Sequence, residues 1–230
     1  MNAMQTSPDT IDLPHVRTAL EKGGRVALFI RHSERPAIQA DDKDFGRHLG
    51  LTPHGIELAR AAGSHLSGFR DARFWASPMT RCRLTARYFA EGMGFEAPLV
   101  EDADALGVRG FFYDDPYAVQ AMMRQQGYMA YMLDYLRDGV APHSKPIGPA
   151  TAQSVDWITR QTTVQLGVFV SHDIFIASVL TGLNVRTYTA DNWVGFLHGA
   201  AFIHTPEGGW VCHACVPDLA AEQAPSHFVH

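Results

Sequence analysis

Residues 27–37 read ALFIRHSERPA and give the clearest indication of the fold. The apolar run RVALFI at 25–30 ends at Arg31 and His32, and Arg35 follows three positions after the histidine. A continuous apolar run is typical of a strand that helices bury on both faces, as in a parallel sheet. Ligands of open α/β sheets bind beyond the carboxyl ends of such strands. The stretch therefore predicts a central strand that carries charged groups to a binding site.

Further strands and helices alternate along the chain. Strand-like runs occupy 73–77, 166–171, 199–204 and 209–216, and turn residues at 206–209 predict a hairpin between the last two. Helical spacing of apolar residues occupies 53–68, 79–92, 116–138, 150–163 and 173–183, with 116–138 forming one helix or two broken near Gly127. This alternation predicts an α/β sandwich with a mostly parallel sheet and an antiparallel edge late in the chain. We expect a single domain over 1–230, with a small helical cap inserted at about 101–165.

Composition excludes several classes of function. The formal net charge of −5 lacks the basic excess that a nucleic-acid-binding protein needs to neutralise phosphates. No apolar run approaches the ~20 residues that span a bilayer, so we expect no membrane partner. The N-terminus, MNAMQTSPDTIDLPHV, lacks the pattern of a signal peptide, and three cysteines provide no disulfide framework. These features favour a cytoplasmic protein.

Cationic and imidazole side chains follow three of the predicted strands. Arg31, His32 and Arg35 follow the first, Arg81 opens the helix after the second, and His172 follows the third. The carboxyl ends of parallel strands meet at one edge of the sheet, next to helix N-termini whose free N–H groups favour anions. Guanidinium groups bind phosphate oxygens in a fork. The sequence therefore predicts a site for a phosphate group.

Four ordered segments carry a resemblance to a known family. FIRHSER, LTPHGIELARAAG, ASPMTRCRLTA and VFVSHDIFIASVL, between about residues 25 and 183, resemble the signatures of the histidine phosphatase superfamily, which includes phosphoglycerate mutases and acid phosphatases. The resemblance implies a three-layer α/β/α fold and a covalent phosphohistidine intermediate. It implies no metal and no other cofactor.

The resemblance also implies roles for individual residues. His32 is similar to the nucleophile, Arg31 and Arg81 to the arginines that clamp the phosphate, and His172 to the second histidine of the pocket. RHSERP resembles the R-H-G-x-R-x-P signature of the acid-phosphatase branch, which makes Arg35 a third clamp.

The group that protonates the leaving oxygen has three candidates. By analogy with the acid-phosphatase branch Asp173 is the first, although an aspartate at a helix start can also be a simple N-cap. Asp104 and Glu101 are alternatives, because the mutase-like branch takes its acid from a glutamate in this region. Ser33 departs from the pattern, since it replaces the glycine that usually follows the histidine.

Together these features predict a metal-independent phosphomonoester hydrolase that acts on a small-molecule phosphate ester through a phosphohistidine at His32. A phosphomutase with the same intermediate and an inactive phosphate-binding protein are the alternatives. The sequence specifies neither the substrate nor the oligomeric state.

Overall fold

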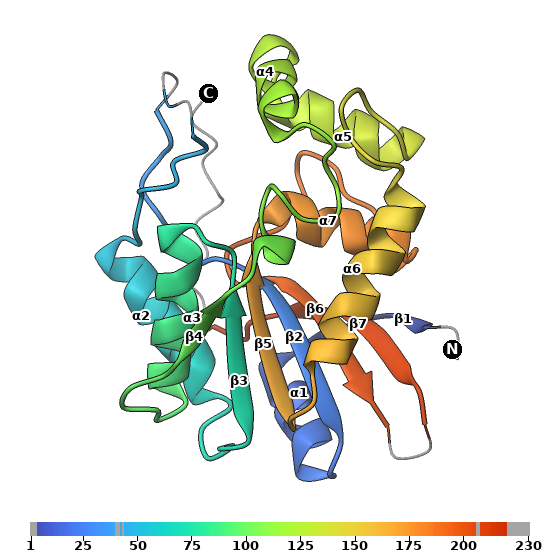
Figure 1. The fold of residues 1–230 in the computed structure, drawn as a ribbon. Coiled ribbons are helices and arrows are strands. Elements are labelled where there is room, and N and C mark those ends of the chain that lie inside the picture. The colour runs from blue at the N-terminus through green and yellow to red at the C-terminus, as the bar shows by residue number, and fades with distance from the viewer. Residues whose placement is uncertain (1–3, 40–41, 43, 206–207, 220–230) are drawn as a thin grey trace.

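The computed structural model describes residues 4–39, 42, 44–205 and 208–219, in which one seven-stranded sheet lies between two layers of helices (Figure 1). The strands are β1 (Gln5–Asp12), β2 (Arg25–Arg31), β3 (Ala72–Ala76), β4 (Val100–Asp102), β5 (Leu166–Ser171), β6 (Gly199–His204) and β7 (Trp210–Val216). Their order is β1-β7-β6-β2-β5-β3-β4. Only β6 pairs antiparallel with its neighbours, so the expected mostly parallel sheet is confirmed.

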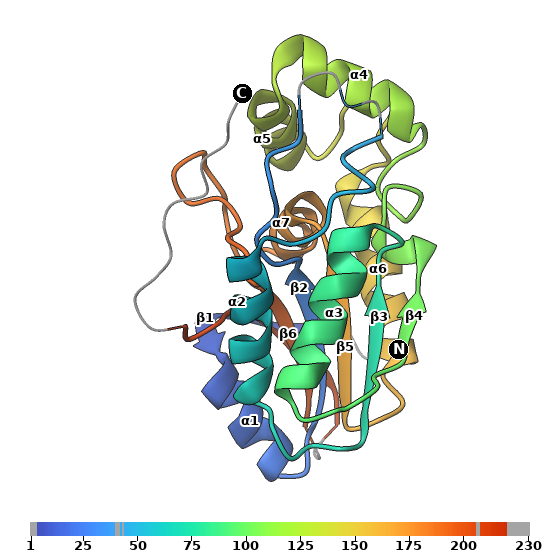
Figure 2. The same cartoon turned by 90° about the vertical axis from the view of Figure 1, so that its left-hand side faces the viewer.

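The helices form two covering layers and a group above the sheet. They are α1 (Leu13–Glu21), α2 (Pro53–Ser64), α3 (Thr80–Gly92), α4 (Pro116–Gln126), α5 (Tyr128–Asp138), α6 (Ile147–Gln161) and α7 (Asp173–Gly182), with a short 3-10 helix, η1, at Asp104–Leu106. Helices α1 to α3 cover one face, and α6 and α7 cover the other (Figures 1 and 2). This is the three-layer α/β/α arrangement that the resemblance implies. Among the described residues, none of these helices combines the length and the apolar character that crossing a lipid bilayer requires.

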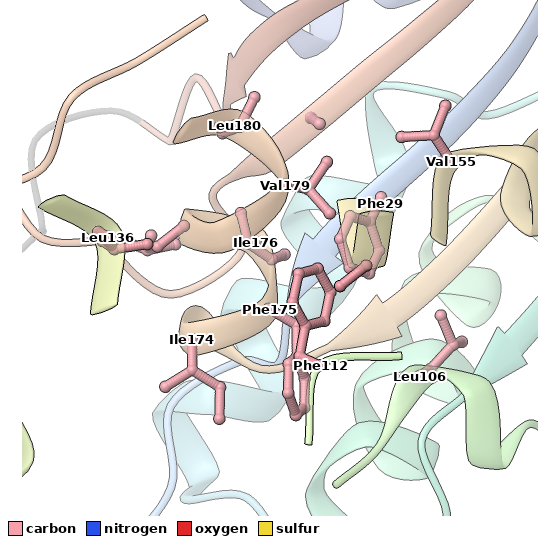
Figure 3. Close-up of a cluster of buried hydrophobic side chains, with 14 of the residues drawn as sticks. Phe29, Leu106, Phe112, Leu136, Val155, Ile174, Phe175, Ile176, Val179 and Leu180 are labelled. Atoms are coloured by element: carbon pink, nitrogen blue, oxygen red, sulfur yellow. The ribbon is translucent and has the colours of Figure 1, made fainter. Parts of the chain in front are cut away.

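Strand β2 lies near the middle of the sheet because both of its faces are apolar. Leu28 and Ile30 pack with α1 to α3, whereas Ala27 and Phe29 pack with α6 and α7 (Figure 3). Side chains alternate between the faces of a strand, so an uninterrupted apolar run fills both cores. Burial of a side chain such as Phe29 stabilises the fold by about 1.5–3 kcal/mol.

Helices α2 and α3 approach one another at two glycines. A Cβ atom on Gly63 would lie 1.9 Å from the Phe89 carbonyl oxygen, and one on Gly92 would lie 2.1 Å from the Arg60 carbonyl oxygen. Only glycine permits this approach of the two backbones. The contact fixes the position of α3, whose second residue is Arg81.

Two strands and one helix were not predicted from the sequence. Strand β1 is largely exposed, contains Pro8 and pairs only with β7, so it lacks the apolar pattern of a core strand. Strand β4 has three residues and pairs only with β3. Helix α1 follows β1 and is capped by Asp12, whose carboxylate accepts the N–H of His15. Since β1 occupies the edge, the expectation of an antiparallel edge was wrong, and the antiparallel strand β6 is internal.

The predicted hairpin between β6 and β7 is confirmed by their antiparallel pairing, although turn residues 206–207 lie outside the described residues. The 116–138 segment is two helices, α4 and α5, broken at Gly127 with a φ of 94°. Both lie beyond the carboxyl end of the sheet, as Figure 2 shows. Helix α6, which also falls within the segment expected to form the cap, packs along the sheet with Val155 and Ile158 in the core.

Candidate active site

His32 is the first residue after β2 and is almost completely buried, with 2% of its surface exposed. Its Nδ1 donates to the carbonyl oxygen of Ser33 at 2.8 Å. Because a protonated Nδ1 fixes the tautomer of a neutral imidazole, the lone pair resides on Nε2. The backbone N–H of His32 donates to the Ser171 carbonyl at 2.9 Å and so links β2 to the end of β5. His32 therefore has the tautomer that an attacking nucleophile needs.

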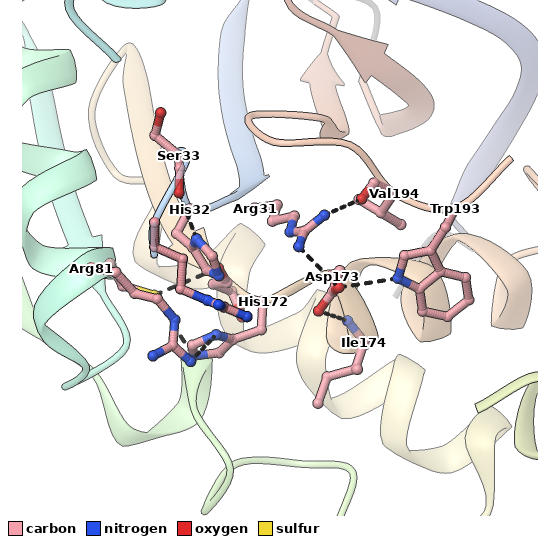
Figure 4. Close-up of polar contacts among 12 residues, drawn as sticks. Arg31, His32, Ser33, Arg81, His172, Asp173, Ile174, Trp193 and Val194 are labelled. Carbon is pink, nitrogen blue, oxygen red and sulfur yellow. Dashed lines mark hydrogen bonds and ion pairs between the residues drawn. The ribbon is translucent and has the colours of Figure 1, made fainter. Parts of the chain in front are cut away.

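Ser33 occupies the position where the family signature has glycine. Its hydroxyl donates to the Gly55 carbonyl at 2.7 Å, and its backbone N–H donates to Thr85 Oγ1 at 2.9 Å. The hydroxyl bond directs the side chain toward α2, and the backbone bond joins residue 33 to α3. Figure 4 shows Ser33 beside His32. Ser33 is not among the residues with positive φ, so its backbone does not require glycine. The departure from the signature therefore leaves the backbone around His32 unstrained.

His172 faces His32 across the site. The two rings are 5.6 Å apart in an edge-to-face arrangement. His172 Nε2 lies 3.0 Å from the Ser77 hydroxyl, and a terminal nitrogen of Arg81 lies 3.4 Å from Nδ1. Since arginine only donates, Nδ1 accepts and Nε2–H donates to Ser77, as expected of a neutral ring. The end of β3, the start of α3 and the end of β5 thus meet at His172.

Three guanidinium groups surround the histidines. Arg31 donates to the Val194 carbonyl, Arg81 to the Gly46 carbonyl at 2.8 Å, and Arg35 to the Pro36 carbonyl at 2.7 Å. In each of these arginines Nε is buried and, within the described part of the chain, has no hydrogen-bond partner. Burial, followed by the charge of Arg81, lowers the pKa of Arg35 to about 10. Buried donors without acceptors are costly, so their convergence favours a site that binds an anion.

Burial and positive charge keep both histidines neutral. Desolvation is the main reason that the pKa of His32 lies well below 6.5, and the charges of Arg81 and Arg31 lower this pKa further. The pKa of His172 is lowered by the same causes in the same order. A neutral His32 retains its lone pair at neutral pH, as nucleophilic catalysis requires.

Asp173 is the first residue of α7 and an ion-paired partner of Arg31. Its Oδ2 lies 3.3 Å from a terminal nitrogen of Arg31 and accepts the indole N–H of Trp193 at 3.0 Å (Figure 4). Burial acts to raise the pKa of Asp173, but Arg31, Trp193 and Tyr128 outweigh it, so the pKa lies below its usual value. Asp173 is therefore a carboxylate at neutral pH.

The two alternative acids lie on the other side of the site. Asp104 starts η1 just beyond β4 and lines a shallow pocket with Ser77 and Arg109. Glu101 is exposed on β4. Ser77 also contacts His172, so Asp104 and His172 share this neighbour. Asp173 thus contacts Arg31 directly, whereas Asp104 is related to the two histidines only through Ser77.

The loop between α7 and β6 completes the site and was not predicted from the sequence. The Phe196 ring lies 4.4 Å from the Arg31 guanidinium carbon and 6.0 Å from the His32 ring. The His198 carbonyl accepts the Arg31 backbone N–H at 2.9 Å. The cluster of aromatic residues in this loop is the sequence feature that could have indicated its place at the site. In the described part of the chain, no group of three or more His, Cys, Asp or Glu residues is arranged to hold a metal ion.

Residues 27–105 match the sequence model of the histidine phosphatase superfamily, branch 1. This part of the chain, about a third of its length, is similar to that superfamily. The matched segment includes Arg31, His32 and Arg81, so the resemblance stated from the sequence is confirmed. The matched model is that of branch 1, and Asp173, which together with Arg35 suggested the acid-phosphatase pattern, lies outside the matched segment. No sequence among curated proteins matches the chain significantly.

Solved structures share the fold of this chain. A mycobacterial glucosyl-3-phosphoglycerate phosphatase superposes with a TM-score of 0.56 at 17% identity, covering 84% of this chain and 98% of that protein. The same protein with inorganic phosphate gives a TM-score of 0.53 at 18% identity, covering 87% and 100%. A phosphoglycerate mutase from Bacillus anthracis gives 0.52 at 12% identity, covering 84% and 94%. These identities establish the fold and leave the reaction open.

Proposed function

We propose that this protein is a phosphomonoester hydrolase that works through a phosphohistidine at His32. The observation that carries this proposal is the presence, around a neutral histidine, of three guanidinium groups whose buried Nε atoms have no hydrogen-bond partner among the described residues. Phosphate is the anion whose charge and oxygen geometry match several arginines at once.

In the first step, His32 Nε2 attacks phosphorus in line with the leaving oxygen. The new N–P bond forms as the bond from phosphorus to the leaving oxygen breaks, and that oxygen takes a proton from a carboxylic acid. Arg31, Arg35 and Arg81 stabilise the charge on the equatorial oxygens by fixed electrostatics, and the neutral His172 ring lies beside His32 in the same site. In the second step, water attacks phosphorus, the N–P bond breaks, and the carboxylate recovers a proton from the water. The products are an alcohol and phosphate.

In this proposal Asp104 is the proton donor. It lines a pocket with Ser77, the neighbour of His172, and has no ion-pair partner among the described residues, whereas Asp173 is paired with Arg31. A positioned acid contributes roughly 10²–10⁴-fold for a poor leaving group.

The remaining parts of the proposal follow from the same chemistry. The histidine nucleophile and the guanidinium groups supply the roles that a metal plays in other phosphatases, so we propose a metal-independent reaction. We further propose a small-molecule phosphate ester as substrate and a cytoplasmic location. Among the proteins that share the fold, one is named a phosphatase and another a mutase, so a phosphomutase is the second candidate.

The experiment is hydrolysis of 4-nitrophenyl phosphate by the native chain, His32→Ala and His48→Ala. His48 is an exposed histidine, with 76% of its side chain accessible, and is the matched control. We expect His32→Ala to lose turnover and covalent ³²P labelling, and His48→Ala to keep both. Full activity of His32→Ala would contradict the proposal. Transfer of the label to a phosphorylated sugar acid faster than to water would favour the phosphomutase.

A further inference from the structure

We propose that Asp173 is a positioning residue that fixes Arg31 and ties it to cap helix α5, rather than the group that protonates the leaving oxygen. This assignment rests on the proposed function, because it concerns a clamp of the same phosphate site. It gives Asp173, the residue after His172, a positioning role in place of an acid role.

Both oxygens of the Asp173 carboxylate already have donors. Oδ2 faces Arg31 at 3.3 Å and accepts the Trp193 indole N–H at 3.0 Å, while Oδ1 accepts the backbone N–H of Ile174 at 3.0 Å. A proton on this carboxyl would compete with three donors and leave the buried Arg31 charge without its counter-ion. Removing one partner of a buried ion pair typically costs several kcal/mol. The surroundings of Asp173 therefore favour a permanent carboxylate.

Arg31 in turn is held on several sides. One terminal nitrogen donates to the Val194 carbonyl, the other faces Asp173, and the Phe196 ring covers the guanidinium at 4.4 Å. These contacts occupy both terminal nitrogens and leave Nε buried without a partner in the described residues. A guanidinium fixed in this way loses little conformational freedom when it binds phosphate.

The contact with the cap is made by Tyr128, the first residue of α5. Interaction with the Tyr128 hydroxyl helps to lower the pKa of the Asp173 carboxyl group. The Tyr128 ring lies 6.2 Å from Trp193, which itself donates to Asp173. Asp173 therefore joins three parts of the chain: the end of β2 through Arg31, the loop before β6 through Trp193, and the cap through Tyr128.

The first experiment is a double-mutant cycle read by isothermal titration with inorganic phosphate. We expect Asp173→Asn to weaken phosphate binding about tenfold in the native background, and to have little effect in an Arg31→Lys background, because effects that act through one contact are not additive. The hydrolysis of 4-nitrophenyl phosphate and of glycerol 2-phosphate should fall by similar factors. Equal effects in both backgrounds would overturn the assignment. Selective loss of glycerol 2-phosphate turnover with unchanged phosphate binding would make Asp173 the proton donor.

A second variant keeps the test valid if Asp173→Asn does not fold. Trp193→Phe removes one donor to Asp173 and retains an aromatic ring, and we expect it to weaken phosphate binding by about two- to fivefold. Unchanged binding in a folded Trp193→Phe protein would contradict the assignment.

The cap contact is tested by Tyr128→Phe, with Tyr117→Phe as the matched control. Tyr117 lies on α4 with 60% of its surface exposed. We expect weaker phosphate binding, about two- to fivefold, for Tyr128→Phe alone. Equal phosphate binding by both variants would show that Tyr128 does not support Asp173, and it would contradict the proposed link to α5. Since binding is measured without turnover, a native chain that binds phosphate and hydrolyses no ester would disprove the proposed function and leave this test in force.

Discussion

Acidification should destabilise this protein before its carboxylates begin to titrate. His32 and His172 are buried, and the pKa of each lies well below the ordinary value of 6.5 in the folded chain. The unfolded chain takes up these two protons first as the pH falls through 6.5, so the free energy of unfolding decreases with pH. The carboxylates whose pKa values are lowered add their own loss only at more acidic pH.

The size of the effect follows from proton linkage. A histidine that titrates at 6.5 when unfolded and stays neutral when folded lowers the free energy of unfolding by about 1.2 kcal/mol between pH 7 and pH 5.5. The two histidines together account for about 2.5 kcal/mol, a large part of the ~5–15 kcal/mol that is typical of a domain. Each of the variants His32→Gln and His172→Gln should lose about half of this pH dependence.

Urea unfolding in phosphate-free buffers at the two pH values measures the difference. His48→Gln, at an exposed position, should behave as the native chain does. If His32→Gln and His172→Gln retain the full pH dependence of the native chain, then the two histidines are not held neutral, and a protonated His32 could not act as the nucleophile.

Four other substitutions test the packing and the clamp. Gly63→Ala should destabilise the chain by about 1–3 kcal/mol in a thermal melt, because its Cβ would meet the Phe89 carbonyl at 1.9 Å. Gly148→Ala, which meets no atom within 4 Å, should instead be neutral or stabilising by up to ~1 kcal/mol, and equal effects of the two would contradict the role given to Gly63. Ser33→Ala removes the bond to α2 and should cost about 1 kcal/mol of stability, with an unchanged KM for 4-nitrophenyl phosphate; a changed KM would place the hydroxyl in the pocket. Arg35→Lys should raise that KM about tenfold because lysine cannot form a fork, and an unchanged KM would place Arg35 outside the clamp.

The central strand and the histidines could be predicted from local patterns. The run at 25–30 is apolar at every position after Arg25 because helices cover both faces of β2. Such a run can be recognised in the sequence alone. The positions of His32 and His172 then follow, since each comes directly after a strand of the parallel pair β2 and β5. This topology alone was enough to predict that the two imidazole rings lie close together.

The remaining parts of the site depend on long-range contacts. The sequence offers no period that would place Trp193 or Phe196 against Arg31, because that loop is irregular and meets β2 only in the folded chain. Strand β1 is polar and β4 is short, so neither carries the pattern of a core strand. Asp173 has the same sequence context whether it donates a proton or holds Arg31, and only its bonded partners distinguish the two roles.

The bond between Arg31 and Val194 joins residues that are 163 positions apart. During synthesis, a chain that ends before Val194 can contain β2, His32 and Arg81, yet it lacks the Val194 carbonyl and the Phe196 ring that contact Arg31. Phosphate affinity should therefore arise only after the segment that contains Val194 and Phe196 has left the ribosome. Binding of phosphate by a refolding chain would accordingly report the completion of tertiary structure rather than the first formation of the sheet.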